Sequence, residues 1–280
     1  MTIFNSVTAA DREEDHILMA KEFITAIKNE TVSVVTSFLE RGVNVNYKSR
    51  RGETALINAS KHGRRDIVEL LLDIEGIEVN AVDLDGYSAF DWACEGNHMD
   101  IVQVFLRNEE FDVTAVDNDG FTILIGAVIL RLDGLVELLL DDGRINVNAV
   151  DNSGQTALMI AASNNLQGMV EMLLRDKRTD PNIPDIHGST ALILATENLH
   201  VEVVEMLLRD ERIDVNAKAL SGRTALVSAA RDGQTLVCEL LLAKHGIDIN
   251  AGDKHNRTAL MHASIVGVPL VVEMLLRHVN

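Results

Sequence analysis

Apolar residues recur along this chain in a pattern that predicts pairs of short helices. Residues 190–198, TALILATEN, begin with a Thr suited to an N-cap and continue with small and aliphatic residues, as expected for a helix that packs close to a neighbour. Residues 201–208, VEVVEMLL, place their apolar side chains on one helical stripe from Val201 to Leu208. An extended segment and a turn follow. We therefore predict a unit of helix, tight turn, helix and hairpin-like tip.

This unit repeats along the chain at a constant spacing of 34 residues. A Gly marks each tip, with a hydroxyl residue two positions later, a small residue in the first helix and a Leu or Phe pair in the second. The tip glycines are Gly52, Gly86, Gly120, Gly154, Gly188 and Gly222. Such fixed self-similarity is typical of a solenoid, because each unit can bury its apolar face only against its neighbours.

The turn between the two helices has a position suited to a left-handed backbone, which would end the first helix. Gly or Asn occupies this position at Gly63, Asn97, Asn165, Gly233 and Gly267. Arg131 and Leu199 take the same position in two other units. A side chain in that conformation costs roughly 1 kcal/mol or more, so these two residues break the rule at some cost in stability.

The residues at fixed positions distinguish between the families that share this period. Tetratricopeptide repeats have the same length, but their Trp, Gly-Tyr and Pro landmarks are missing here. The series T-A-L-x-x-A, L-L, D-V-N-A and D-x-x-G resembles the ankyrin repeat over roughly residues 20–280. The resemblance implies an all-α fold, an ankyrin-repeat solenoid of stacked helix-turn-helix units with hairpin-like tips. The Thr-Pro-Leu-His of the family is replaced here by Thr-Ala-Leu and a residue other than His.

The register of the repeats predicts the domain organisation. We expect an N-terminal tail at 1–16, an N-terminal capping repeat at 17–49, and a terminal repeat, complete or truncated, at 254–280. The ankyrin repeats between them are predicted at 50–83, 84–117, 118–151, 152–185, 186–219 and 220–253. The last repeat keeps the apolar columns of the interior repeats, so three interpretations stay open: a longer array, end-to-end self-association, or tolerated exposure.

Composition narrows the classes of partner. The formal net charge of −18 argues against a nucleic-acid or membrane surface, because binding to phosphates needs clustered Lys and Arg. Aromatic residues make up only 4% of the chain, which predicts a core of aliphatic side chains. Cys94 and Cys238 form no CxxC motif, and no apolar run approaches the length of a membrane span. We expect a cytoplasmic protein, with the nucleus as the alternative.

The chain lacks the sequence patterns of catalysis and metal binding. It has no G-x-x-x-x-G-K-S/T, H-E-x-x-H or G-x-S-x-G motif. DLDG at 83–86 and DNDG at 117–120 are similar to part of a calcium loop, but Ala81 and Ala115 stand where the first ligand is needed. We predict that the protein is not an enzyme and that it has no catalytic residues, no cofactor and no metal.

The resemblance to ankyrin repeats implies a concave groove whose partner contacts flank the tip Gly and end the first helix. Several of these positions carry large apolar side chains here, and Tyr and Trp are enriched at binding hot spots. The predicted anchors are Tyr87, Trp92, Phe121, Ile129 and Leu130, with Asp85, Asp91 and Glu95 selecting a basic group. The alternative interpretation is that these side chains pack within the fold.

Trp92, the only Trp, occupies a first-helix position whose side chain varies widely between repeats. Elsewhere this position holds Asn58, Gly126, Ile160, Leu194, Ser228 and His262. Because polar residues occur there, we expect the position to be partly exposed. Basic residues gather at groove positions near both ends of the chain, at Arg50, Arg51, Lys61, His62, Arg223, Arg231, Lys254, His255 and Arg257.

These features predict a non-enzymatic protein–protein interaction module, an adaptor or scaffold that binds a partner in the groove. We expect a protein partner with a basic segment, and neither nucleic acid nor membrane. We expect a monomer, with end-to-end self-association as the alternative. The alternative function is the substrate-recognition array of a larger enzyme, such as a ubiquitin ligase or kinase, whose catalytic part is missing from this chain.

Overall fold

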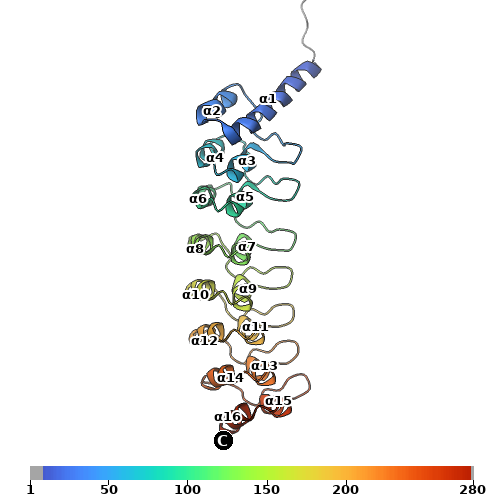
Figure 1. Ribbon diagram of the computed structural model, residues 1–280, viewed down its shortest axis with the longest axis vertical. Coiled ribbons are helices and arrows are strands. Elements are labelled where there is room, and N and C mark those ends of the chain that lie inside the picture. The colour runs from blue at the N-terminus through green and yellow to red at the C-terminus, as the bar shows by residue number, and fades with distance from the viewer. Residues whose placement is uncertain (1–8, 279–280) are drawn as a thin grey trace, which may run out of the picture. The chain divides into compact units, whose positions relative to one another are not determined.

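The computed structural model describes residues 9–278, where the regular structure consists of helices and isolated β-bridges (Figure 1). These residues form two compact units, the first ending at Asp112 and the second beginning at Val113. Each unit stacks helix pairs that are joined by hairpin-like tips. The predicted all-α solenoid is therefore confirmed.

The helices follow the predicted order of first and second helix in each repeat. The first unit contains α1 (Ala9–Asn29), α2 (Val32–Glu40), α3 (Ala55–Lys61), α4 (Arg65–Leu72), α5 (Ala89–Glu95) and α6 (Met99–Arg107). The second unit contains α7 (Ile123–Ile129), α8 (Asp133–Asp141), α9 (Ala157–Ser163), α10 (Gln167–Arg175), α11 (Ala191–Glu197), α12 (Val201–Arg209), α13 (Ala225–Arg231), α14 (Thr235–Leu242), α15 (Ala259–Val266) and α16 (Pro269–His278). The helices predicted at 190–198 and 201–208 correspond to α11 and α12.

The segment predicted as an N-terminal tail is helical from Ala9 onward, where α1 begins. Residues 1–8 of the predicted tail lie outside the described residues. The sequence of α1 contains many strong helix formers and neither Gly nor Pro, which explains a helix longer than the repeat pattern predicts. α1 packs against α2 and α3, and α2 packs against α4, at the start of the stack.

Most first helices begin with the N-cap that the column of hydroxyl residues predicts. The hydroxyl oxygen of Thr224, for example, accepts a hydrogen bond from the backbone N–H of Val227 at 3.3 Å. Ser88 forms a complete capping box at the start of α5. Thr190 stands at the same position before α11 but makes no such bond, and its buried hydroxyl has no partner among the described residues. The side-chain cap predicted for that helix is therefore wrong.

The left-handed turn that was predicted between the helices is present in both units. The backbone angle φ is +57° at Arg131 and +63° at Leu199, close to the +66° of Gly63 and the +56° of Asn165. The repeat imposes this conformation whatever residue occupies the position, and the two long side chains accept it at a cost in conformational energy.

The two units have cores of different composition. In the second unit the core is aliphatic, and one Leu from each second helix is completely buried: Leu139, Leu173, Leu207, Leu241 and Leu275. In the first unit Phe90 stacks on Phe111 with 4.7 Å between ring centroids, and Phe105 lies 5.5 Å from Phe111. The aliphatic core expected from composition is thus wrong for the last repeat of the first unit.

Adjacent tips within a unit are joined by backbone hydrogen bonds. Lys254 N donates to Ser221 O at 2.9 Å, and Leu220 N donates to His187 O at 2.8 Å. Gly222 has a φ of +74°, and a Cβ atom there would stand only 2.6 Å from Lys254 N. Gly is therefore required at this tip both by its own backbone conformation and by the approach of the next tip.

A column of asparagine side chains ties several repeats to the one after them, and is interrupted at Thr114. Nδ2 of Asn148 donates to Arg178 O at 2.8 Å, while its Oδ1 accepts from Asp180 N at 2.8 Å. The same pair of bonds is made by Asn46, Asn80, Asn182 and Asn216. Both ends of each amide bind backbone atoms, so the bond does not depend on the side chains of the neighbouring repeat.

The last repeat is only partly covered. Val271 and Leu275 are completely buried, Val272 is half-buried, and Leu276 is 50% exposed. Residues 279–280 of the predicted terminal repeat lie outside the described residues.

Candidate partner-binding site

The residues predicted to contact a partner lie on one side of each unit, which we call the tip face. It comprises the residues that flank each tip Gly and those that end each first helix. Figure 1 shows the tips on the side of the first helices, away from the second helices. The first helices are α3 and α5 in the first unit and α7, α9, α11, α13 and α15 in the second. Successive repeats of one unit therefore add side chains to the tip face in sequence order.

An aromatic pair dominates the tip face of the first unit. The rings of Tyr87 and Trp92 lie 5.4 Å apart between centroids with a 41° angle between their planes. Tyr87 is 46% exposed, whereas Trp92 is half-buried. The indole Nε1 of Trp92 donates a hydrogen bond to Oδ2 of Asp83 at 2.9 Å. The fold thus positions the tryptophan ring before any partner is present.

A lysine of the preceding repeat lies on the tryptophan ring. Nζ of Lys61, at the end of α3, is 3.6 Å from the centroid of Trp92. The same ammonium group forms an ion pair with Glu53 at 3.0 Å, and that carboxylate is almost buried. A cation at this distance over an indole face is attracted by the electron density of the ring. The ring of Trp92 is therefore a surface that accepts a positive charge.

The expectation that the Trp92 position is exposed in other repeats is wrong for most of them. Asn58 and Ser228 are fully buried, and His262 is nearly so. Both make a local hydrogen bond: Asn58 Nδ2 donates to Thr54 O at 2.9 Å and Ser228 Oγ donates to Glu197 Oε1 at 3.1 Å. Among the described residues Oδ1 of Asn58 has no partner. A polar residue at this position thus reflects an available hydrogen-bond partner and does not indicate exposure.

The predicted acidic residues have different roles. Asp91 Oδ2 accepts from both the backbone N–H and the hydroxyl of Ser88, at 2.8 and 2.7 Å, and so completes the cap of α5. Asp85 and Glu95 are exposed on the tip face beside the aromatic pair. Of the three carboxylates, these two are the ones free to meet a basic group from solution.

The other three predicted anchors belong to the second unit. Phe121 follows the tip Gly120 and is half-buried, and its backbone N–H donates to Asp117 Oδ1 at 2.8 Å. Ile129 and Leu130, at the end of α7, are 43% and 59% exposed. These residues form an exposed apolar group within one repeat of that unit.

The tip aspartates act as turn-forming residues, as the sequence of the tips indicates. Asp83 Oδ1 accepts the backbone N–H groups of Asp85 and Tyr87, each at 3.0 Å, which closes the tip. The same two-bond pattern occurs at Asp117, Asp151, Asp185 and Asp253. The recurring Asp three positions before the tip Gly was the available signal, because an Asp side chain that caps a turn is a common local motif.

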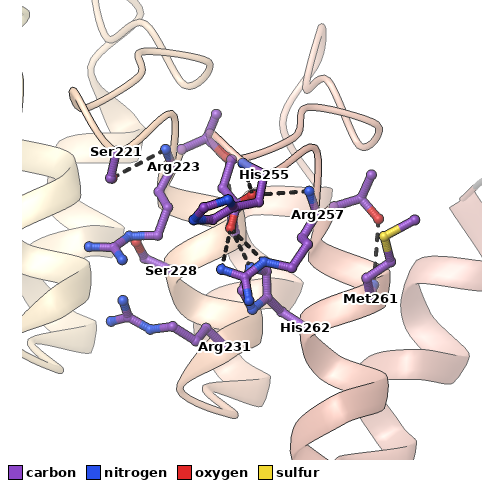
Figure 2. A network of polar contacts seen from close by, with 12 residues as sticks. Ser221, Arg223, Ser228, Arg231, His255, Arg257, Met261 and His262 are labelled. Atoms are coloured by element: carbon purple, nitrogen blue, oxygen red, sulfur yellow. Dashed lines mark hydrogen bonds and ion pairs between the residues drawn. The ribbon is translucent and has the colours of Figure 1, made fainter.

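A second polar network lies on the tip face of the second unit (Figure 2). Oδ2 of Asp253 accepts from Nε2 of His262 at 3.0 Å and from the guanidinium of Arg257 at 2.9 to 3.0 Å. Glu197 reaches the next repeat, where Arg223 Nη2 and Ser228 Oγ each donate to it at 3.1 Å. The sequence placed these arginines at groove positions, but it did not show which carboxylates they would bind.

The network stabilises the ionised form of Asp253. Burial alone would raise the pKa of this carboxyl, but the backbone N–H groups of Arg257 and His255 and the side chains of His262 and Arg257 outweigh it. The pKa of Asp253 is consequently held well below its usual range. The carboxylate remains charged at neutral pH and is neutralised by its neighbours.

The two thiols are not reactive groups. Cys94 and Cys238 are buried, and burial raises the pKa of each thiol to about 12. A thiol with such a pKa is protonated at neutral pH and is a poor nucleophile.

One further feature of the second unit, a groove, lies away from the tip face. A groove of about 950 Å³ opens between α10 and α12, and its charged residues include the ion pair of Arg175 with Glu171 at 2.6 Å. In residues 9–278, no helix combines the length and apolar character needed to cross a membrane.

Stacked helix pairs with hairpin-like tips, and a tip face in each unit, define a helical-repeat protein. The chain belongs to the ankyrin-repeat family: the family described as ankyrin repeats (3 copies) matches residues 23–117, 74–151, 109–185, 133–219 and 214–280. Members of this family bind protein partners and are generally non-catalytic modules.

The chain is also similar to part of an enzyme. The human (Homo sapiens) 2-5A-dependent ribonuclease is 46% identical over 61 residues. The similar segment spans 21% of this chain and only 8% of that protein.

Proposed function

We propose that this protein is a non-enzymatic adaptor or scaffold that binds a partner protein on its tip face. The predicted contacts are Tyr87, Trp92, Phe121, Ile129 and Leu130, with Asp85, Asp91 and Glu95 favouring a basic segment. The aromatic pair of the first unit carries the proposal, because Tyr87 is largely exposed and Trp92 already holds the ammonium group of Lys61. A lysine or arginine from a partner would find an aromatic surface and two exposed carboxylates together.

The charge around the aromatic pair supports a basic rather than an acidic partner. Lys61 is neutralised by Glu53, whereas Asp85 and Glu95 remain exposed on the same face. A cationic side chain stacked on Tyr87 would gain about 0.5 to 2 kcal/mol from the ring, in addition to its attraction to these carboxylates. Asp91 would contribute through its charge alone, since its oxygen is engaged by Ser88.

The test is affinity capture from the source cell with the wild type and a Tyr87→Ala/Phe121→Ala variant. Leu236→Ala/Leu270→Ala is the matched control, because both leucines are more than half exposed and neither is a predicted contact. We expect the first variant to lose a partner that the control retains, with the fold of both confirmed by circular dichroism. Equal retention by the two variants would overturn the proposed site.

A direct measurement on the recovered partner is available because Trp92 is the only tryptophan. Titration of a peptide from the partner should change the fluorescence of Trp92, and replacement of its Lys and Arg residues should abolish the change. An unchanged spectrum on binding would place the contact away from this ring.

The second candidate function is the substrate-recognition array of a larger enzyme. The similarity to a segment of a ribonuclease favours it, because that protein combines such a segment with an enzymatic activity. Sequencing of the complete transcript tests this candidate: a catalytic domain in the same reading frame would support it.

We further propose that the protein is cytoplasmic, with the nucleus as the alternative, and that it is a monomer rather than an end-to-end assembly. Microscopy of a tagged chain tests the first proposal. Sedimentation equilibrium at high concentration tests the second, since self-association would raise the apparent mass with concentration.

A further inference from the structure

Three arginines occupy tip-face positions in two successive repeats of the second unit. Arg223 and Arg257 occupy the same position beside successive tips, and Arg231 ends the helix α13 between them. Figure 2 shows the side chains of Arg223 and Arg231 extending in the same direction. We call these three residues the arginine cluster.

Each guanidinium of the cluster already binds a carboxylate of the chain. Nε and Nη2 of Arg231 hold the two oxygens of Asp232, each at 2.8 Å, in a bidentate pair. Arg223 holds Glu197, and Arg257 holds Asp253. The geometry of the site is thus suited to carboxylates, because the planar fork of a guanidinium matches their two oxygens.

Some guanidinium N–H groups of the cluster donate to no acceptor within the part of the chain that the structure describes. Arginine carries five N–H groups; Arg231 and Arg257 bond through Nε and Nη2, whereas Arg223 bonds through Nη2 alone. Within residues 9–278, no hydrogen bond engages Nη1 of any of the three arginines. A second carboxylate can therefore bind without displacement of the first.

The surface of this region is more basic than the net charge of the whole chain indicates. The side chain of Arg257 is 45% exposed while its partner Asp253 is 3% exposed, so the positive group faces solvent and the negative one is buried. Lys254 and His255 are exposed beside them. The cations of the cluster together with Lys254 outnumber the three carboxylates by four to three, in a chain whose net charge is −18.

We propose that the arginine cluster binds an acidic segment of a protein, through Asp or Glu side chains that accept from the free guanidinium N–H groups. This site is separate from the aromatic pair of the first unit and takes a partner segment of opposite charge.

Two exposed aliphatic side chains favour a protein segment over a nucleic acid. Leu220, before the tip of Arg223, is 77% exposed, and Ile265, at the end of α15, is 70% exposed. An acidic peptide with aliphatic residues between its carboxylates satisfies both kinds of group. A polyphosphate would instead meet the net repulsion of an acidic chain, and gains nothing from Leu220 or Ile265.

The first test measures binding of a fluorescein-labelled peptide of alternating Glu and Leu by anisotropy. We expect the wild type to bind it despite the like sign of the two net charges, and Arg223→Gln/Arg231→Gln to weaken binding by about tenfold. Arg175→Gln/Arg209→Gln is the control, since it removes the same charge from exposed positions on α10 and α12. An equal loss in the control would show nonspecific electrostatics and overturn the proposal.

A gain of affinity provides a second test that misfolding cannot imitate. Asp232→Asn removes the carboxylate that occupies Arg231, so we expect it to tighten binding by about threefold or more. Glu171→Gln makes the same charge change beside Arg175 on α10 and should leave the affinity unchanged.

The competing ligand is an oligothymidylate of the same charge as the peptide. Tighter binding of this oligonucleotide would overturn the assignment to an acidic protein segment, as would failure of both the wild type and Asp232→Asn to bind the peptide. Either failure leaves the proposed contact at Tyr87 and Trp92 unaffected, because that site lies in the first unit and is measured with a basic peptide.

Discussion

The indole N–H of Trp92 donates to Oδ2 of Asp83 at 2.9 Å, which fixes the only tryptophan to the tip of its own repeat. His262 and Asp253 reproduce this relationship at the same separation in sequence, with 3.0 Å between Nε2 and Oδ2. In both tips the other carboxylate oxygen accepts backbone N–H groups. One aspartate therefore couples the tip to the first helix, and in the first unit it also orients the proposed binding surface.

Replacement of Asp83 by Asn should break this coupling. The amide can keep Oδ1 toward the backbone, but it then points an NH₂ group at the indole N–H, so two donors face each other. We expect Asp83→Asn to lose about 1 to 3 kcal/mol in the free energy of unfolding, measured with urea, and to shift the emission of Trp92. Asp117→Asn is the control, since the aligned first-helix position there is Gly126, and it should change little.

Replacement of Leu199 by Gly should stabilise the second unit. Leu199 is 60% exposed and holds a φ of +63°, so it contributes strain without burying its side chain. We expect Leu199→Gly to raise the free energy of unfolding by about 1 kcal/mol. Leu220→Gly offers a comparison at an exposed leucine without positive φ, and a similar rise there would contradict the explanation.

Replacement of Gly222 by Ala should destabilise the same unit. The new Cβ would lie 2.6 Å from Lys254 N, at a φ of +74°. We expect a loss of about 1 to 3 kcal/mol, from the backbone conformation and from displacement of the next tip. Gly168→Ala in α10 has open space around its Cβ and should be neutral or stabilising in the same assay.

Truncation of Leu207 should be the most damaging of these changes. Its side chain is completely buried between neighbouring second helices, so Leu207→Ala leaves a cavity and should cost about 2 to 5 kcal/mol. Leu236→Ala removes the same atoms from a side chain that is 62% exposed, and should change stability by less than about 0.5 kcal/mol. Differential scanning calorimetry of the two variants measures the difference.

The second unit should lose stability as the pH falls below about 4. The pKa of Asp253 is lowered by its hydrogen bonds, and the pKa values of Asp142, Asp176 and Asp210 are lowered by Arg144, Arg178 and Arg212 respectively. Because each folded-state pKa lies below the unfolded value, the stabilisation is complete above the unfolded pKa and disappears as the pH falls toward the folded one. Urea midpoints between pH 6 and pH 3 should therefore decrease.

Asp253→Asn provides the matched comparison for the pH dependence. The variant should be less stable than the wild type at pH 6, because Arg257 and His262 lose their partner, but its midpoint should fall less steeply with acid. A slope equal to that of the wild type would show that Asp253 does not titrate in this range.

The repeat architecture was predictable because its determinants are local. The helices α11 and α12, and the left-handed turn at Leu199, follow from apolar spacing and from the position of one residue between two helices. No comparable local rule predicts that Lys61 lies on Trp92, since the two belong to different repeats. The burial of Ser228 likewise depends on Glu197, a residue of the preceding repeat.

The division into two units was also absent from the sequence pattern. The period continues unchanged across Asp112 and Val113, so nothing in the spacing of apolar residues marks that position. The cluster of Phe90, Phe105 and Phe111 just before it was equally hidden, because a low aromatic content for the whole chain says nothing about where the few rings gather.

The asparagine column has a consequence for how such a protein changes over time. Asn148 recognises only the backbone of the following repeat, at Arg178 O and Asp180 N, and the other asparagines of the column do the same. A duplicated or recombined repeat would meet the same atoms whatever side chains it carried. Stacking of neighbouring repeats and recognition of partners therefore depend on different residues. The residues that recognise partners can diverge while the stacking of the repeats is conserved.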